Sequence, residues 1–253
     1  MNEVNKNMLR NYIYIPHCGS TNTQLKQTVR AAAGPVFSVL SAESQSGGRG
    51  RRGKSFFSPA GGLYFSAAYP LPEDTANAPF FTLLAGLAAA EALEALTGAR
   101  ILLKWPNDLY LNGKKLGGIL TELVRTPACS TAGVGFGVNT ALPLSAFPQE
   151  LRGILTSFAA EGYPVPERKT AVRAVVNALD AYIYAERALS RDTAPYAEKI
   201  NARFYLKNRR VKIVSGETVT EGAALCLAPN GALLLQTENG ITQILSGTVI
   251  NDE

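Results

Sequence analysis

The sequence predicts an α+β protein, with a mixed β-sheet flanked by helices over residues 1–204 and a small β-barrel over residues 205–253. Two observations carry this prediction. Helix and strand patterns are interspersed up to Phe204, whereas only short strands joined by Gly and Asn turns follow it. Closely spaced short strands without helices are typical of a small barrel. We therefore place a domain boundary near residue 205.

The elements of the larger part follow from local signals. A helix is expected after Ser20, because Thr21 and Gln24 have capping-box spacing and Gly34-Pro35 would end the helix near residue 33. Strand patterns occur at 36–42, 63–69, 100–105, 108–111, 115–124 and 131–139. Helical patterns occur at 78–96, 151–160, 167–189 and 194–204. Asn112-Gly113 is the strongest hairpin signal. Beyond the boundary, strands are predicted at 211–214, 219–227, 232–237 and 242–245.

Composition favours a packed protein of the cytoplasm. Of the 253 residues, 46% are hydrophobic and 18% are charged, which is enough for a core. Three separated cysteines and a single histidine predict neither disulfides nor structural zinc, and they indicate a reducing compartment. No apolar run reaches the ~20 residues of a membrane span, and the first residues lack a secretory pattern. We therefore expect a cytoplasmic protein without a membrane partner.

The positive charge is concentrated in one segment. The net charge is +5, yet no acidic residue occurs between Glu43 and Glu73. The segment 48–55, with the sequence GRGRRGKS, fits both the Walker A pattern and the dinucleotide-binding pattern. Both patterns require a helix directly afterwards, and the following FFSPAGG cannot continue as one. Two interpretations remain, an arginine clamp for an anionic ligand and a solvated basic loop that binds nucleic acid nonspecifically.

A second segment carries charged residues around a rigid corner. Lys104 and Asp108 flank Trp105-Pro106, and Lys115 opens a strand that continues into two glycines. In the simpler interpretation, Trp105 anchors the core and Asp108 caps a turn. A lysine beside glycines is also suitably placed to face a small-molecule pocket.

Five motifs then resemble biotin–protein ligases in order and spacing: STN at 20–22, ESQSGGRGRRGK at 43–54, KWPND at 104–108, KLGGIL at 115–120 and GVGFGVN at 133–139. The resemblance begins near residue 14 and covers nearly the whole chain. It implies the catalytic fold of biotin and lipoate ligases, which is similar to that of class II synthetases, followed by an SH3-like barrel. It also implies biotin and ATP as substrates, with Mg²⁺.

The resemblance assigns the site residue by residue. Biotin is expected to contact Ser20, Thr21, Asn22, Gln45, Arg49, Gly50, Arg51, Lys115, Gly118, Gly135 and Gly137. ATP is expected to contact Arg51, Lys54, Phe56, Lys104, Asn107, Asp108 and Asn139. The catalytic residues would be Arg49, Arg51, Lys115 and Asp108. No metal is expected from the protein alone, although Mg²⁺ would accompany ATP near Asp108.

The residue types suit the implied reaction. A carboxylate that attacks the α-phosphorus of ATP brings two anions together, so cations must offset the repulsion and the charge on pyrophosphate. This step needs no general base, because the carboxylate is already ionised, and we expect His17 to be structural. A lysine of a biotin carboxyl carrier protein or carrier domain would then attack the mixed anhydride, and Asp108 would orient or deprotonate that amine.

Some expectations concern what the chain lacks, and some alternatives stay open. Too few residues precede Ser20 for the DNA-binding domain of many bacterial relatives, so we expect no DNA partner. A homodimer is compatible with the sequence but not required by it. Phe56 stands where relatives often have Trp, which leaves stacking on adenine open. Lipoate–protein ligase and a nucleic-acid-binding module are the rival functions. The former usually shows an Arg-Arg-x-Ser-Gly-Gly-Gly pattern, and the latter would interleave aromatic residues with its cations.

Overall fold

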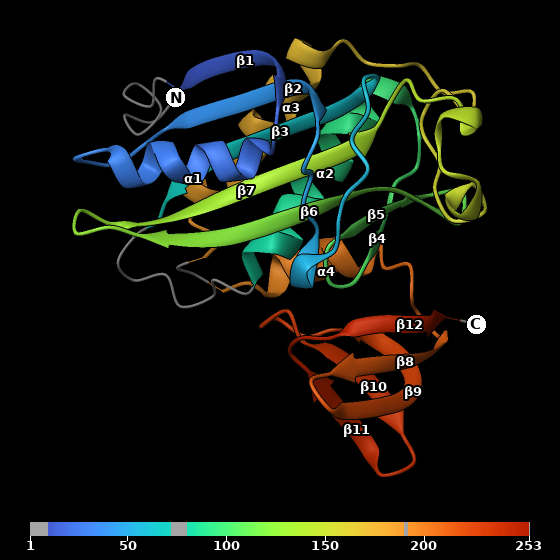
Figure 1. The fold of residues 1–253 in the computed structure, drawn as a ribbon. Coiled ribbons are helices and arrows are strands. Elements are labelled where there is room, and N and C mark those ends of the chain that lie inside the picture. Colours follow the sequence, from blue (N-terminus) through green and yellow to red (C-terminus); the bar gives the residue numbers. More distant parts are fainter. Residues whose placement is uncertain (1–9, 72–79, 190–191, 253) are drawn as a thin grey trace.

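A computed structural model describes residues 10–71, 80–189 and 192–252 (Figure 1). The larger part contains a seven-stranded sheet in the order β1-β2-β3-β7-β6-β5-β4. Its strands are β1 Asn11–Cys18, β2 Ser38–Gln45, β3 Gly62–Pro70, β4 Leu102–Lys104, β5 Asp108–Leu111, β6 Lys114–Arg125 and β7 Ser130–Asn139. Only the β1–β2 pair is parallel, and the other neighbours are antiparallel. The predicted mixed sheet is therefore confirmed.

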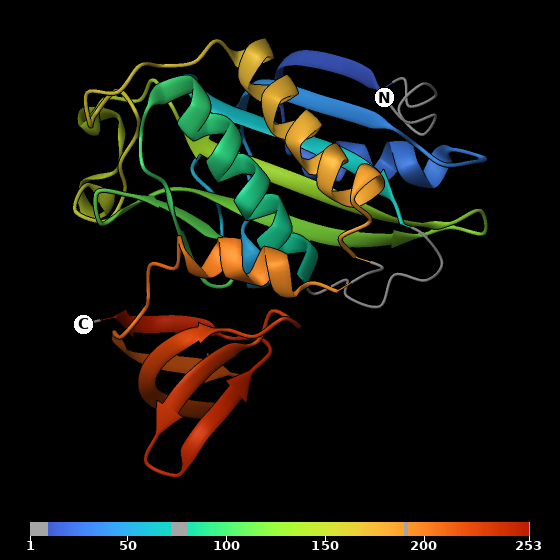
Figure 2. The same ribbon diagram turned by 180° about the vertical axis from the view of Figure 1, so that it is seen from behind.

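Helices cover both faces of this sheet. α1 (Thr21–Ala31) lies on one face, while α2 (Phe81–Thr97) and α3 (Arg168–Asp180) lie on the other (Figures 1 and 2). Most of α2 is buried, because its Ala/Leu-rich surface contacts the sheet, α3 and α4 (Ala194–Asn201). A helix that is apolar all round suits this sandwiched position. The helix predicted at 78–96 is thus found in α2, and positions 78–79 lie outside the described residues.

Four local predictions need correction. Residues 151–160 do not form a helix, because their backbone pairs with β6 through Lys115 N–H to Ile154 O and Thr156 N–H to Lys115 O. The helix from 167 ends at Asp180 and continues as a π-helical turn, Ala181–Ala185. Strand β1 was not predicted, because its mostly exposed residues lack a half-buried alternation. The capping box expected from Thr21 and Gln24 is also wrong, since Ser20 is the N-cap of α1 and Thr21 is already its first residue.

The C-terminal part forms a separate curled antiparallel sheet, as expected for an SH3-like domain (Figure 1). The strand order is β11-β10-β9-β8-β12. The strands are β8 Arg210–Ser215, β9 Thr218–Leu227, β10 Leu233–Thr237, β11 Gly240–Ile244 and β12 Thr248–Asp252. Four of them fall at predicted positions, and β12 is additional. The Asn201 side chain joins this sheet to α4 by two hydrogen bonds with the Leu227 backbone, of 2.9 and 2.7 Å.

Among the described residues, no helix is both long and apolar enough to cross a membrane.

Candidate active site

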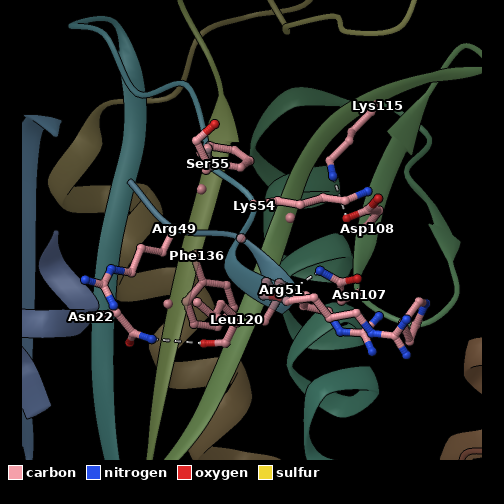
Figure 3. Close-up of a pocket in the computed structure, with 18 of the residues that line it drawn as sticks. Asn22, Arg49, Arg51, Lys54, Ser55, Asn107, Asp108, Lys115, Leu120 and Phe136 are labelled. Atoms are coloured by element: carbon pink, nitrogen blue, oxygen red, sulfur yellow. Dashed lines mark hydrogen bonds and ion pairs between the residues drawn. The ribbon is translucent and has the colours of Figure 1, made fainter. Parts of the chain in front are cut away.

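A cavity of about 300 Å³ gathers nearly all the predicted site residues. Its walls come from the start of α1, the loop at 49–56, the β4–β5 corner, the strands β6 and β7, and the first residues of β12. Figure 3 shows how the cationic side chains and Asp108 lie around this space. Of the residues expected to bind biotin or ATP, Asn139 alone is not in the lining. It is buried at the end of β7, where its amide donates to Thr156 O at 2.9 Å.

One wall is a fixed network of hydrogen bonds at the N-terminus of α1. Gln45 Oε1 accepts from both the backbone N–H of Thr21, at 2.8 Å, and the Thr21 hydroxyl, at 3.1 Å. The Thr21 hydroxyl also lies 2.8 Å from Ser66 Oγ, and Gln45 Nε2 donates to Ser58 Oγ at 3.0 Å. Gln45 is therefore bonded at both ends, so its amide orientation is set before a ligand arrives. Such a wall presents polar groups at fixed angles.

Sequence reasoning missed Ser66 in this network. The residue is completely buried on β3, in a strand that is otherwise almost wholly apolar. A buried hydroxyl needs a hydrogen-bond partner, so a serine within that apolar run was a usable signal. Ser58 was missed as well, because it lies in an irregular loop without periodicity.

The basic loop folds back on itself without starting a helix. Arg49 pairs with Ser55, and Gly50 N–H donates to Lys54 O at 2.7 Å. Arg51–Gly53 form a single 3-10 turn, in which Arg52 is left-handed with φ 54°. Because no helix N-terminus follows, the loop is neither a Walker A loop nor a dinucleotide-binding turn.

The same loop rests on the C-terminal sheet. Arg51 Nη1 donates to Gly247 O at 3.2 Å. Arg52 Nη1 lies 3.2 Å from both Val214 O and Thr248 Oγ1, which belong to β8 and β12. The small domain therefore forms part of the pocket, and Thr248 with Val249 line it directly. No sequence pattern pointed to these two residues.

The cavity is strongly cationic. Of the described residues, six basic ones and one acidic one, Asp108, are in its lining. Among the residues that the structure describes, none forms an ion pair with Arg49, Arg51 or Lys54. Burial lowers the pKa of the Arg51 guanidinium, the neighbouring Arg52 lowers it further, and Asp108 raises it. A pocket with this surplus of positive charge favours anionic ligands.

Lys115 on β6 and Asp108 on β5 meet diagonally across neighbouring strands, since Lys115 is in register with Tyr110 and Asp108 with Gly118. Lys115 Nζ is 2.7 Å from Asp108 Oδ1, and both side chains are about one-quarter exposed, at 25% and 23%. The lysine is thus close enough to the pocket to meet a ligand carboxylate, while a partner holds it in place. Asp108 lines the same part of the pocket, so its carboxylate is also placed to meet an amine.

Two other predicted ATP residues are engaged with the protein itself. Lys104 Nζ donates to the Tyr110 hydroxyl at 3.1 Å and lies 4.9 Å from the centre of that ring. Asn107 donates through Nδ2 to Ile119 O at 2.9 Å, which ties the corner to β6. Both residues still line the pocket.

Trp105 anchors the corner in the core, as the simpler interpretation predicted. It is buried, and its Nε1–H donates to Gly231 O of the C-terminal part at 3.1 Å. Phe56 packs on the floor of the pocket against Gly137, where an added Cβ atom would lie 2.5 Å from the Phe56 ring. Any larger residue at position 137 would therefore force the Phe56 ring to move. His17 lies outside the lining, with Nδ1 3.0 Å from Ser44 Oγ.

Among the described residues, no group of three or more His, Cys, Asp and Glu side chains is arranged to hold a metal ion. Asp108, the one carboxylate that the described residues contribute to the lining, is held by Lys115. Mg²⁺ is usually bound through one or two carboxylates together with substrate phosphates. The donor set therefore fits an ion that is brought in by phosphates, not one that the protein holds alone.

The fold and the pocket together define a ligase-type catalytic domain with an appended C-terminal β-domain. The Biotin/lipoate A/B protein ligase family matches residues 14–139, and the Biotin protein ligase C terminal domain matches residues 208–250. The chain therefore belongs to the biotin protein ligase family.

Individual relatives agree with this assignment. The biotin–[acetyl-CoA-carboxylase] ligase of Mycobacterium tuberculosis is 30% identical over 248 residues, which cover 94% of this chain and 87% of the relative. The bifunctional ligase/repressor BirA of Escherichia coli is 32% identical over 216 residues, which cover 82% of this chain but 64% of the relative. The structure of the Aquifex aeolicus biotin protein ligase in complex with biotin and ATP is similar, with a TM-score of 0.81, 30% identity, and coverage of 94% of this chain and 97% of that one.

Proposed function

We propose that the protein forms biotinyl-5'-AMP from biotin and ATP, and transfers the biotinyl group to a lysine of a biotin carboxyl carrier protein or carrier domain. The observation that carries this proposal is the shape of one cavity, in which a fixed hydrogen-bonding wall adjoins a cluster of cations. The wall suits the ureido ring of biotin, and the cations suit a carboxylate and a triphosphate. Family membership and the complex of the Aquifex relative with biotin and ATP support the same assignment.

In the first step, a carboxylate oxygen of biotin attacks the α-phosphorus of ATP and pyrophosphate leaves. Lys115 would hold the attacking carboxylate, and Arg49 and Arg51 would stabilise charge on the phosphates. Mg²⁺ would arrive with ATP and lie near Asp108. These cations act before and during bond formation, because two anions must approach each other within the pocket.

In the second step, the carrier lysine attacks the acyl carbon of the adenylate, AMP leaves, and the amine loses a proton. Among the described residues, Asp108 is the only acidic side chain in the lining. We assign it the role of orienting the incoming ammonium or accepting its proton. Asp108 can do this after the first step, because the biotin carboxylate that Lys115 held has then become part of a mixed anhydride and no longer carries a negative charge.

Transfer of labelled biotin tests the proposal directly. Purified protein is incubated with biotin, MgATP and a purified biotin carboxyl carrier domain, and the label on the carrier is counted. The expected result is incorporation that requires ATP and is lost when the acceptor lysine is replaced. Pyrophosphate release with lipoate but not with biotin would assign the protein to the lipoate branch. No reaction with either acid would refute a ligase function.

A further inference from the structure

Asn22 lies on the pocket wall with one half of its side-chain amide fully used. It is buried, and its Nδ2 donates to Glu122 Oε2 on β6 at 2.6 Å. A second, longer contact of 3.5 Å runs from Nδ2 to Leu120 O on the same strand (Figure 3). An amide nitrogen carries two N–H groups. Both therefore face β6, where they meet a carboxylate and a carbonyl.

The other half of the amide has no partner among the residues that the structure describes. Asn22 Oδ1 is buried and accepts no hydrogen bond from any of them. It lies beside Gly135, where an added Cβ atom would come within 3.3 Å of it, and both residues line the pocket. Leaving a buried acceptor unsatisfied is costly. The atom is thus suited to accept a hydrogen bond from a ligand that reaches this wall.

Glu122 decides which half of the amide is free. Turning the Asn22 amide over would place Oδ1 against the Glu122 carboxylate and the Leu120 carbonyl, where three acceptors would face one another. Lys26 reinforces this arrangement, since its Nζ is 2.5 Å from Glu122 Oε1. Asn22 and Lys26 are four residues apart on α1 and so share one face of the helix. Neither Glu122 nor Lys26 lines the pocket.

We propose that Glu122, held by Lys26, is a positioning residue that locks the Asn22 amide so that Oδ1 accepts an N–H from the ligand. The inference rests on the proposed function, which makes that N–H one of the two in the ureido ring of biotin. Without the carboxylate, Asn22 presents either its oxygen or its nitrogen to the pocket. The site then loses its preference for a donor at this position.

The test compares biotin with two ring analogues in which one or the other ureido N–H is replaced by oxygen. Dissociation constants are measured by calorimetry for the unaltered protein, Glu122→Met, Glu122→Gln and Lys26→Met. Glu221→Gln is the matched control, because Glu221 also forms an ion pair, at 2.7 Å with Lys212, but on the C-terminal sheet and outside the pocket lining. Thermal unfolding of each variant shows whether it is folded.

The unaltered protein and the control should bind biotin about tenfold or more tighter than one of the two analogues. Glu122→Met should weaken the binding of biotin and leave the affinity for that analogue almost unchanged. The ratio of the analogue's dissociation constant to that of biotin should then fall to about threefold or less. Glu122→Gln and Lys26→Met should also lower this ratio of dissociation constants. These two variants test the proposal if Glu122→Met does not fold.

Two results would overturn the positioning role: an unchanged ratio in the Glu122 variants, or equal loss of affinity for biotin and both analogues, as a purely structural defect would give. The inference also fails if the unaltered protein binds biotin and both analogues equally. If the unaltered protein binds no biotin at all, the proposed function itself fails, and this outcome is visible before any variant is made.

Discussion

Replacing Lys115 should weaken biotin binding by more than the loss of one cation, because it exposes the ligand to the carboxylate left behind. Lys115 Nζ is 2.7 Å from Asp108 Oδ1, and both side chains are in the pocket lining. Lys115→Met keeps an apolar stem of similar length but removes the charge. Biotin carboxylate then loses its counter-ion and is repelled by an unpaired Asp108.

The size of the repulsion between biotin and unpaired Asp108 follows from how deeply the ion pair is buried. Exposed ion pairs contribute roughly 0.2–1 kcal/mol, whereas breaking a buried pair costs about 3–5 kcal/mol. With about a quarter of each side chain exposed, the Lys115–Asp108 pair falls between these limits. We therefore expect unpaired Asp108 to contribute ~1–2 kcal/mol of the loss, or about 5- to 30-fold in affinity.

A double-mutant cycle measures this contribution. Biotin affinity is determined by calorimetry for the unaltered protein, Lys115→Met, Asp108→Asn and the double variant. The double variant should bind biotin about 5- to 30-fold tighter than Lys115→Met alone. The exposed pair Lys212–Glu221, which has the same 2.7 Å separation, is the control and should show no effect on biotin. Additivity of the two single changes within about 0.5 kcal/mol would refute the reasoning.

Three further outcomes are expected. Arg51→Ala should raise the activation barrier of adenylation by about 2–4 kcal/mol, measured through the rate of pyrophosphate release, with a smaller change in biotin affinity. Arg52→Ala should have a milder effect on this rate. Equal, near-normal rates in the two variants would contradict a role for the loop. Biotin plus MgATP should suppress proteolysis after Arg51 or Arg52, because ligand anions neutralise the loop, and equal cleavage would count against ordering. Asp180→Asn should lower the free energy of unfolding in urea by about 3 kcal/mol, since it breaks the buried pair with Arg10; a change below about 1 kcal/mol would show that the pair contributes little.

The parts of the fold that were predictable carry their signal within a few residues. Asn112-Gly113 forms the β5–β6 turn, and both residues have positive φ, at 48° and 79°. Such backbone angles favour Asn and Gly, which made the hairpin recognisable from two letters. The buried helix α2 was similarly evident, because its Ala/Leu composition persists over four turns or more. In both cases, the local preference and the tertiary environment agree.

Prediction failed where tertiary contacts override the local pattern. The segment 151–160 is sufficiently apolar for a helix, yet Ile154 O and Thr156 N–H bond to the backbone of Lys115 at the start of β6. Strand β1 has the opposite problem, because it lies at the sheet edge with most side chains exposed and so shows no alternation. Neither outcome follows from residues near in sequence. Both depend on which strand happens to lie alongside.

The candidate site shows the same division. Nearly every site residue that the motifs predicted lines one cavity, because each motif marks a segment that the fold brings to the same face. The motifs did not reveal that Asp108 holds Lys115, or that Glu122 holds Asn22, since a partner on another strand has no fixed spacing in the sequence. Motifs thus identify the groups that meet the ligand better than those that orient them.

The contribution of the C-terminal sheet is the clearest example of this limit. Arg51 and Arg52 meet Gly247 and Thr248, which are 196 residues further along the chain in each pair. The basic loop therefore depends on the C-terminal sheet for part of its support, which nothing in the loop's own sequence indicates. Because carbonyl and hydroxyl oxygens accept the guanidinium N–H groups without neutralising their charge, this support holds the arginines in place and leaves their positive charge available to an anionic ligand.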